Sequence, residues 1–276
     1  NMTGRLGEDD LHDEVMRGIR TAMDEVKPDA WLVAENGDFL ASDLNGFGWH
    51  GAMNYQGFMR PLWNWINQNS SIGGGFQGLP FEMPKIGGKS LVASMVQFSS
   101  SIPWRSLVAS MVLLDSHDTA RMRTVVNGDK KAHLSAVTAM LTYPGVPSIF
   151  AGDEIGLEGS WGEDSRRTIN WEDRSGWDHE FLAEVKKLVH LRRNHDGLIE
   201  GGLRWVAVED NFICYLRESE KQSLLVFISR KAVRTEIDLA DYGYKVSKTL
   251  YGPEATGGSI KIDAEYATQG IWEVKS

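Results

Sequence analysis

Three short apolar runs, each followed closely by carboxylates, constrain the fold of this chain more than any other feature of its sequence. The runs cover residues 30–34, 107–114 and 146–151. Short apolar runs of this kind are typical of strands that are buried on both faces of a parallel sheet. Apolar residues at three- and four-residue steps predict helices around these runs, at residues 8–26, 89–99, 130–142 and 181–193. We expect a capping box at Ser175–Asp178 to start the last of these helices.

Strands that alternate with helices predict an α/β barrel or a doubly wound sheet, and both folds carry their chemistry at the strand ends. After about residue 200 the pattern changes to short alternating strands divided by turns, at residues 204–208, 212–217, 223–229, 235–239 and 270–274. We therefore predict two domains. Residues 1–200 form the α/β part, and residues 201–276 form a separate antiparallel β-sandwich.

Two further segments call for comment. Residues 69–89 are rich in glycine and proline and are too long for a simple connection, which predicts a functional loop or lid. The hexapeptide Leu-Val-Ala-Ser-Met-Val occurs at residues 91–96 and again at 107–112, first in a predicted helix and then in a predicted strand. Nothing repeats around it, so we interpret it as coincidence.

Composition excludes several classes of function. The 276 residues include 29 Lys and Arg against 38 Asp and Glu, a net charge of −9, which disfavours a nucleic-acid surface. No apolar run approaches the roughly 20 residues of a membrane span, so we expect no membrane partner. The single cysteine, Cys214, can form no internal disulfide, which favours a reducing compartment and a cytoplasmic location.

Carboxylates at strand ends are the strongest candidates for chemistry. Glu35 follows the first apolar run directly, and Asp118 follows the second with His117 beside it. A single acidic residue after a strand is usually only a loop residue. Two of them on separate strands, beside a histidine, would face one mouth of a barrel and favour an active site. The histidines include no H-E-x-x-H, and we predict no metal site.

The chain contains ten tryptophans, which suggests a sugar site, because aromatic rings stack on sugar faces and carboxyl pairs cleave glycosidic bonds. Trp31 lies within a predicted strand, so we expect it in the core. Trp49, Trp161 and Trp177 lie in predicted loops and are the better candidates for sugar platforms.

Several motifs resemble those of the α-amylase superfamily, glycoside hydrolase family 13. The segment Leu-Leu-Asp-Ser-His-Asp-Thr-Ala-Arg at 113–121 resembles the family's asparagine-histidine-aspartate motif after the seventh barrel strand, and 143–156 is similar to its eighth-strand segment. Residues 31–35 resemble the fifth-strand segment that carries the general acid. The triplet Met-Asn-Tyr at 53–55 and the segment 188–198 also have counterparts in the family, in the same order.

The resemblance implies roles for individual residues. Glu35 would be the general acid and base, while Asp118 and His117 would hold sugar hydroxyls and favour a distorted ring. Asn54 and Tyr55 would bind substrate, together with Trp49, which its loop position already suggested. The sequence departs from the family pattern at Ser116, where asparagine is usual, and at Ala34, where glycine often stands. Both replacements leave the proton chemistry intact.

One expected motif is missing. The family's nucleophile is an aspartate in a glycine-x-arginine-x-aspartate motif on the fourth strand, and nothing before Glu35 matches it. The aspartates upstream lie in helix or turn patterns, at Asp9, Asp10, Asp13, Asp24 and Asp29. We therefore expect the C-terminal part of such an enzyme: strands five to eight of a partial (β/α)8 TIM barrel, followed by a small all-β C-terminal domain.

The resemblance implies a retaining α-glucoside hydrolase acting on α-1,4-glucans or malto-oligosaccharides. We expect this chain alone to be inactive and its partner to be the missing N-terminal half of the barrel. No cofactor is predicted, although calcium cannot be read from the sequence. A transglycosylase or sugar isomerase of the same superfamily remains an alternative, as does a non-catalytic carbohydrate-binding or accessory homologue.

Overall fold

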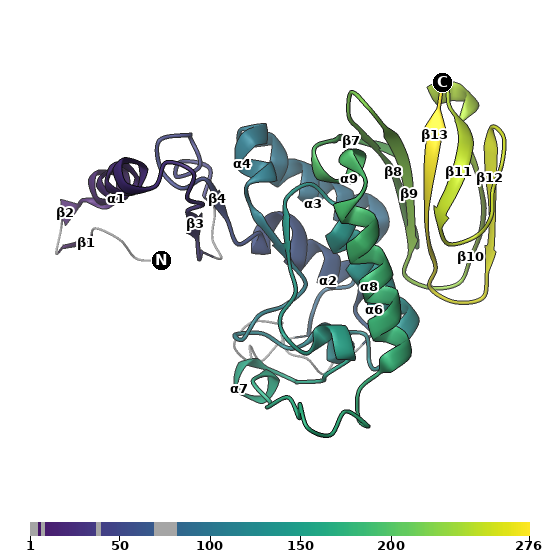
Figure 1. Cartoon of the computed structure of the whole chain (residues 1–276), viewed down its shortest axis with the longest axis horizontal. Helices are drawn as coiled ribbons and strands as arrows, with labels where there is room; N and C mark the ends of the chain where they lie inside the picture. The colour runs from purple at the N-terminus through teal and green to yellow at the C-terminus, as the bar shows by residue number, and fades with distance from the viewer. Residues whose placement is uncertain (1–4, 7–8, 37–39, 69–81) are drawn as a thin grey trace.

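The computed structural model describes residues 5–6, 9–36, 40–68 and 82–276, so most of the predicted lid, at 69–81, lies outside the described residues. The elements succeed one another in three zones (Figure 1). A helix at the N-terminal end comes first, a group of parallel strands with helices lies in the middle, and antiparallel sheets lie at the C-terminal end. None of the described helices is long and apolar enough to span a membrane.

The first zone contains β1 (Arg5–Leu6), β2 (Asp9–Asp10) and α1 (His12–Val26). The two short strands pair antiparallel, so the prediction of a helix or turn for Asp9 and Asp10 is wrong. The helix itself is confirmed with a later start. It buries Met16 alone, and a hydrogen bond of 2.9 Å between His12 and Asp43 links it to the following loop.

The second zone is built on four short parallel strands, β3 (Val33–Ala34), β4 (Gly51–Ala52), β5 (Met111–Leu113) and β6 (Val146–Ser148). β3 pairs parallel with β4, and β5 pairs parallel with β6. A parallel bridge between Met53 and Met111 joins the two pairs. All four strands therefore run in one direction, and their carboxyl ends lie on one side.

Helices surround these strands: η1 (Tyr55–Met59), α2 (Arg60–Ile66), α3 (Gly88–Ser100), α4 (Trp104–Val108), α5 (Met122–Val125), α6 (Lys130–Thr142), η2 (Asp153–Ile155), α7 (Gly162–Ser165), α8 (His179–Arg193) and α9 (Asp196–Ile199). The predictions for α3, α6 and α8 are confirmed. The predicted cap of α8 is wrong, because the side chain of Asp178 itself accepts a hydrogen bond from the Phe181 amide at 3.2 Å.

The predicted buried strands are shorter and more exposed than expected. β3 comprises two residues, and Trp31 before it is 45% exposed, so its predicted place in the core is wrong. Its indole Nε1 instead donates a hydrogen bond of 2.8 Å to the carbonyl of Ala109. Val146 in β6 is 38% exposed. In β5, by contrast, the consecutive residues Val112 and Leu113 are both buried. Among the described residues β6 pairs with β5 alone, and this edge position explains the exposure of Val146.

The repeated hexapeptide adopts two structures. Its first copy, at residues 91–96, lies entirely in α3. Its second copy, at 107–112, covers the end of α4, a turn, and the start of β5, so the prediction of one long strand there is wrong. In this copy Ser110 Oγ donates to the Ser106 carbonyl at 2.7 Å and accepts from the Ala52 amide at 3.2 Å. Pairing with neighbouring strands therefore overrides local preference.

The third zone contains a five-stranded antiparallel sheet in the order β11-β13-β9-β8-β7 and a separate antiparallel pair of β10 and β12. The bounds are β7 (Gly202–Glu209), β8 (Phe212–Glu218), β9 (Ser223–Ser229), β10 (Val233–Asp238), η3 (Ala240–Tyr242), β11 (Lys245–Tyr251), β12 (Ser259–Ala264) and β13 (Gln269–Lys275). Five of these strands match predicted ones, whereas the sequence reading missed β11 and β12.

Side chains alternate between the two faces of the large sheet. Tyr215 and Val226 belong to the core that the helices of the second zone also form, while Cys214 and Phe227 belong to a second core shared with β10 and β12. Helices α6 and α8 lie between the parallel strands and this sheet (Figure 1). Because one core extends across the boundary predicted at residue 200, the division into two domains stays a prediction.

Candidate active site

The loops that follow β3 and β5 bring three predicted residues together. Glu35, His117 and Asp118 each offer one carboxylate oxygen or ring nitrogen, and these atoms lie within 4.8 Å of one another. The parallel direction of the strands explains this, since their carboxyl ends meet on one side. The sequence predicted this juxtaposition from the strand ends, and the catalytic roles stay predictions.

A network of short hydrogen bonds fixes the loop that carries Asp118. The Asp118 amide donates to Ser116 Oγ at 3.2 Å, and the Tyr55 hydroxyl donates to the same oxygen at 3.0 Å. The Ser116 amide in turn donates to Thr119 Oγ1 at 2.9 Å. The hydroxyl that replaces the usual asparagine therefore has a structural role, because it ties the loop to η1.

Helix α7 and the residue after it hold the Asp118 carboxylate from the other side. Arg166 Nη2 donates to Asp118 Oδ1 at 2.9 Å, and Arg166 Nε donates to the carbonyl of His117 at 2.9 Å. His117 Nε2 lies 3.4 Å from the same carboxylate oxygen. A Cβ atom at Gly162 would lie 3.2 Å from the Asp118 carbonyl oxygen, so glycine permits this close approach. One oxygen of Asp118 is thereby fixed in orientation.

Tyr55 lies beneath the site rather than at its surface. Its side chain is 3% exposed. Burial is the main cause that raises the pKa of its phenol; the hydrogen bond to Ser116 opposes this, and the nearby charges of Asp118 and Glu35 raise it further. Tyr55 therefore stays neutral and can support the loop, but it offers little surface to a sugar.

Like Tyr55, the other two residues predicted to bind substrate beside His117 are buried, and their binding role stays a prediction. Asn54 is 1% exposed, and its Oδ1 accepts a hydrogen bond of 2.8 Å from the Gly57 amide at the start of η1. Trp49 is 9% exposed and belongs to the core, and its ring forms a T-shaped pair with His12 at 6.4 Å between centroids. The sequence placed Trp49 in a loop, but His12 of α1 packs against its ring.

Other aromatic residues are exposed. Trp161, directly before α7, is 49% exposed, and a Cβ atom on its neighbour Gly162 would lie 3.2 Å from the Asp118 carbonyl oxygen. Trp161 therefore directly precedes the helix that approaches Asp118, and its role as a sugar platform stays a prediction. Trp177 is half-buried and packs edge-on against Trp171 at 5.5 Å between ring centroids.

Among the described residues, the trio of Glu35, His117 and Asp118 is also the one group with a geometry that could hold a metal ion. Three donors, one of them an imidazole, do not fit the six to eight oxygen ligands that calcium prefers. The guanidinium of Arg166 beside Asp118 further reduces the negative charge available to a cation. The donor set therefore provides no calcium site by itself.

Sequence reasoning missed the residues that support the site from a distance. Arg166 contacts a residue 48 positions earlier, and Arg121 forms a 2.7 Å ion pair with Asp153, 32 positions later. Arg121 was visible in the motif after β5, but nothing in its local pattern indicated its partner. No periodicity could have pointed to Arg166.

Comparisons with known proteins agree with this architecture. Residues 8–180 match a family model described as the catalytic domain of alpha amylase. A cyclomaltodextrinase from a Bacillus species is 31% identical over 216 residues, which are 77% of this chain and 36% of that enzyme. An intracellular maltogenic amylase from Bacillus subtilis is 28% identical over 226 residues, which are 81% of this chain and 36% of that enzyme.

Solved structures share the fold. A debranching enzyme from Nostoc punctiforme superposes with a TM-score of 0.81 at 22% identity, over 94% of this chain and 55% of that one. A cyclic α-maltosyl-(1→6)-maltose hydrolase from Arthrobacter globiformis gives a TM-score of 0.76 at 21% identity, over 95% of this chain and 53% of that one. The chain thus spans about a third of the length of the curated relatives that it matches.

Proposed function

The chain belongs to the α-amylase family of glycoside hydrolases, and we propose that it forms part of a retaining enzyme acting on α-1,4-glucans or malto-oligosaccharides. The observation that carries this proposal is the meeting of Glu35, His117 and Asp118 from two separate strand ends. Glycosidic bond cleavage requires a carboxyl group as general acid, and Glu35 supplies one beside groups that can bind sugar hydroxyls. The names of the relatives, cyclomaltodextrinase and maltogenic amylase, support the same class of substrate.

In this proposal Glu35 protonates the oxygen of the leaving sugar and later removes a proton from the attacking water. Asp118 and His117 bind sugar hydroxyls and favour the distorted, oxocarbenium-like ring. Arg166 contacts Asp118 Oδ1 and keeps that carboxylate in one orientation. The carboxylate can then bind the sugar in the transition state without first having to be ordered.

The nucleophile is proposed to lie outside this chain. Asp9 and Asp10 form β2, which among the described residues pairs antiparallel with β1 alone. Asp13 and Asp24 lie in α1 and Asp29 lies in the turn after it, so none of the five follows one of the parallel strands. Asp118 has a carboxylate near Glu35, but Arg166 and His117 already engage it. We therefore assign the nucleophile to another strand of the barrel, carried by a polypeptide that completes this site.

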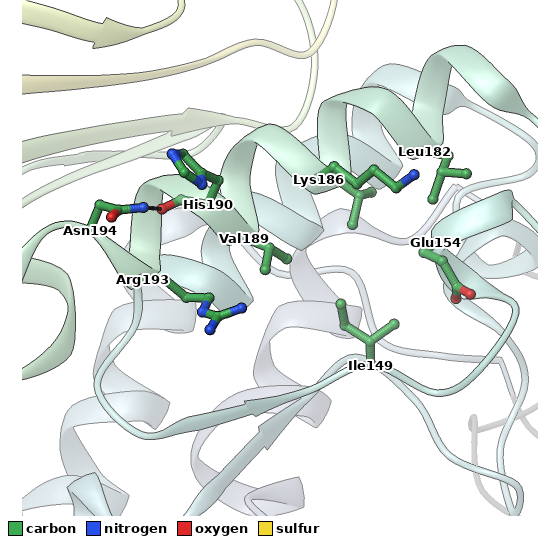
Figure 2. A pocket seen from close by; sticks show the side chains of 9 residues that line it. Ile149, Glu154, Leu182, Lys186, Val189, His190, Arg193 and Asn194 are labelled. Carbon is green, nitrogen blue, oxygen red and sulfur yellow. Dashed lines mark hydrogen bonds between the residues drawn. The ribbon is translucent and has the colours of Figure 1, made fainter.

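One surface supports such a completing partner. Within the described residues β6 pairs with β5 alone, and Ile149 just after it is 36% exposed. Figure 2 shows the groove between this residue and α8, where Leu182 and Val189 lie beside Lys186. Its volume is about 670 Å³. A parallel strand with its following helix would pair with β6 and cover these apolar side chains.

The test compares the purified 276-residue chain with the same chain after coexpression with a polypeptide carrying the first four barrel strands of the Bacillus cyclomaltodextrinase. We expect no maltoside hydrolysis by the chain alone and measurable hydrolysis by the reconstituted enzyme. The control is the cyclomaltodextrinase polypeptide by itself. Steady turnover by the 276-residue chain alone would overturn the assignment of the nucleophile to another polypeptide.

A further inference from the structure

Two buried carboxyl groups lie close together behind the candidate site. Asp115 follows β5 and is 3% exposed, while Asp153 begins η2 and is 4% exposed. The two side chains are within hydrogen-bonding reach of each other. The mechanism proposed above uses neither of them.

The surroundings of the pair supply one positive charge. Arg121 is 1% exposed, and its Nη1 donates to Asp153 Oδ1 at 2.7 Å. Its other nitrogens donate to the carbonyls of Ala151 and Ser165, at 3.0 and 2.8 Å. One guanidinium therefore faces two carboxyl groups, and a second negative charge in this buried place would be costly.

The hydrogen bonds of Asp115 show where a proton belongs. Its Oδ2 accepts from the Met122 amide at 2.6 Å. Its Oδ1 is buried and has no hydrogen-bond partner among the described residues. A buried polar atom is nearly always paired. A proton on Oδ1 would satisfy this atom, because it could then be donated to Asp153.

The electrostatic environment acts in the same direction. Burial, and then the charge of Asp153, raise the pKa of Asp115 well above its usual range, while the Met122 amide and Arg121 oppose this. Burial also raises the pKa of Asp153, against the hydrogen bond from Asp115 and the charge of Arg121, and Glu154 in η2 raises it further. Asp115 is therefore the member of the pair that keeps the proton.

We propose that Asp115 is protonated at neutral pH and donates a hydrogen bond to Asp153, so that the two share one negative charge balanced by Arg121, and that this bridge positions the His117–Asp118 segment. Asp115 lies two residues before His117, and the Ser165 carbonyl that Arg121 holds directly precedes Arg166. The positioning part of this proposal rests on the proposed function, whereas the location of the proton does not.

Asp115→Asn tests the proton. Its amide nitrogen can donate to Asp153 while its oxygen accepts from Met122, so it copies the protonated carboxyl group but cannot lose the proton. In the unchanged chain, at a pH between the ordinary and the raised pKa of Asp115, this carboxyl group is protonated in the folded state and ionised in the unfolded state. The free energy of unfolding therefore falls as pH rises through this interval.

We therefore compare the melting temperatures of D115N and the unchanged chain at each pH. The difference should shift in favour of D115N by at least about 3 °C between pH 5 and pH 8. Asp241→Asn, at an exposed carboxyl group in η3, should show no such change. A melting-temperature difference between D115N and the unchanged chain that is constant with pH would overturn the proposal.

NMR of the unchanged chain with ¹³C-labelled aspartate gives a second measurement that does not depend on the variant's folding. The Asp115 carboxyl signal should remain that of the acid at pH 7, and titration of this signal in the ordinary aspartate range would contradict the proposal.

The positioning role is tested through the imidazole NMR signals of His117. D115N should preserve these signals, while Asp153→Asn should shift them. Unshifted signals in D153N would refute the positioning role, and kinetics of the reconstituted enzyme test the proposed function separately.

Discussion

The two sides of the candidate site are built very differently. Asp118 is held by Arg166, by the Ser116 hydroxyl and, through the segments around it, by the buried Arg121. Glu35 follows a two-residue strand and is exposed to solvent. Contacts within this chain therefore fix the orientation of Asp118 and leave Glu35 facing solvent. In the proposed enzyme, the completing polypeptide would cover Glu35 and exclude water, which favours general acid catalysis.

The largest effect should come from the buried support on the Asp118 side. Arg121→Met leaves Asp153 as a buried charge without its partner, so the free energy of unfolding should fall by about 3–5 kcal/mol. Urea denaturation measures this. Arg234→Met, which breaks an exposed pair with Asp263, is the control and should cost at most about 1 kcal/mol. Equal losses of unfolding free energy in the two variants would show that the buried Arg121–Asp153 pair stabilises the chain no more than the exposed Arg234–Asp263 pair.

On the Glu35 side the expected effect is catalytic. In the reconstituted enzyme, Glu35→Gln removes the transferable proton and keeps the shape, so kcat on maltosides should fall at least about 100-fold, or about 2.7 kcal/mol. α-Maltosyl fluoride, whose leaving group needs no protonation, should lose far less in the glycosylation step. Glu220→Gln, at an exposed turn, is the control. Similar losses on both substrates would show that Glu35 is not the acid.

The smallest effect concerns the attachment of β3. Trp31→Phe removes the hydrogen bond from the indole to the Ala109 carbonyl while keeping an aromatic ring, and should cost about 1 kcal/mol of unfolding free energy. Trp104→Phe, at a residue of similar exposure in α4, should cost less than about 0.5 kcal/mol. If the Trp31 variant costs no more than the Trp104 variant, the indole does not anchor the Glu35 side.

Sequence reasoning succeeded where the signal was local and periodic. The bounds predicted for α6 are those observed, and five of the seven C-terminal strands were identified from alternation and turns. It failed where burial decided the outcome. Trp31 was expected inside and is half exposed, while Trp49 was expected outside and is buried. Both errors have one cause: a residue's place in a strand or a loop does not specify what packs on it.

The sequence by itself determined which residues stand at strand ends, and through its motifs it determined the family. That knowledge placed Glu35, His117 and Asp118 on one side, because parallel strands share a direction. Tertiary structure alone decided which groups support them. Arg166 meets Asp118 across 48 positions, and Arg121 meets Asp153 across 32. Such contacts depend on how the loops after different strands pack together, and the spacing of residues along the chain does not encode this packing.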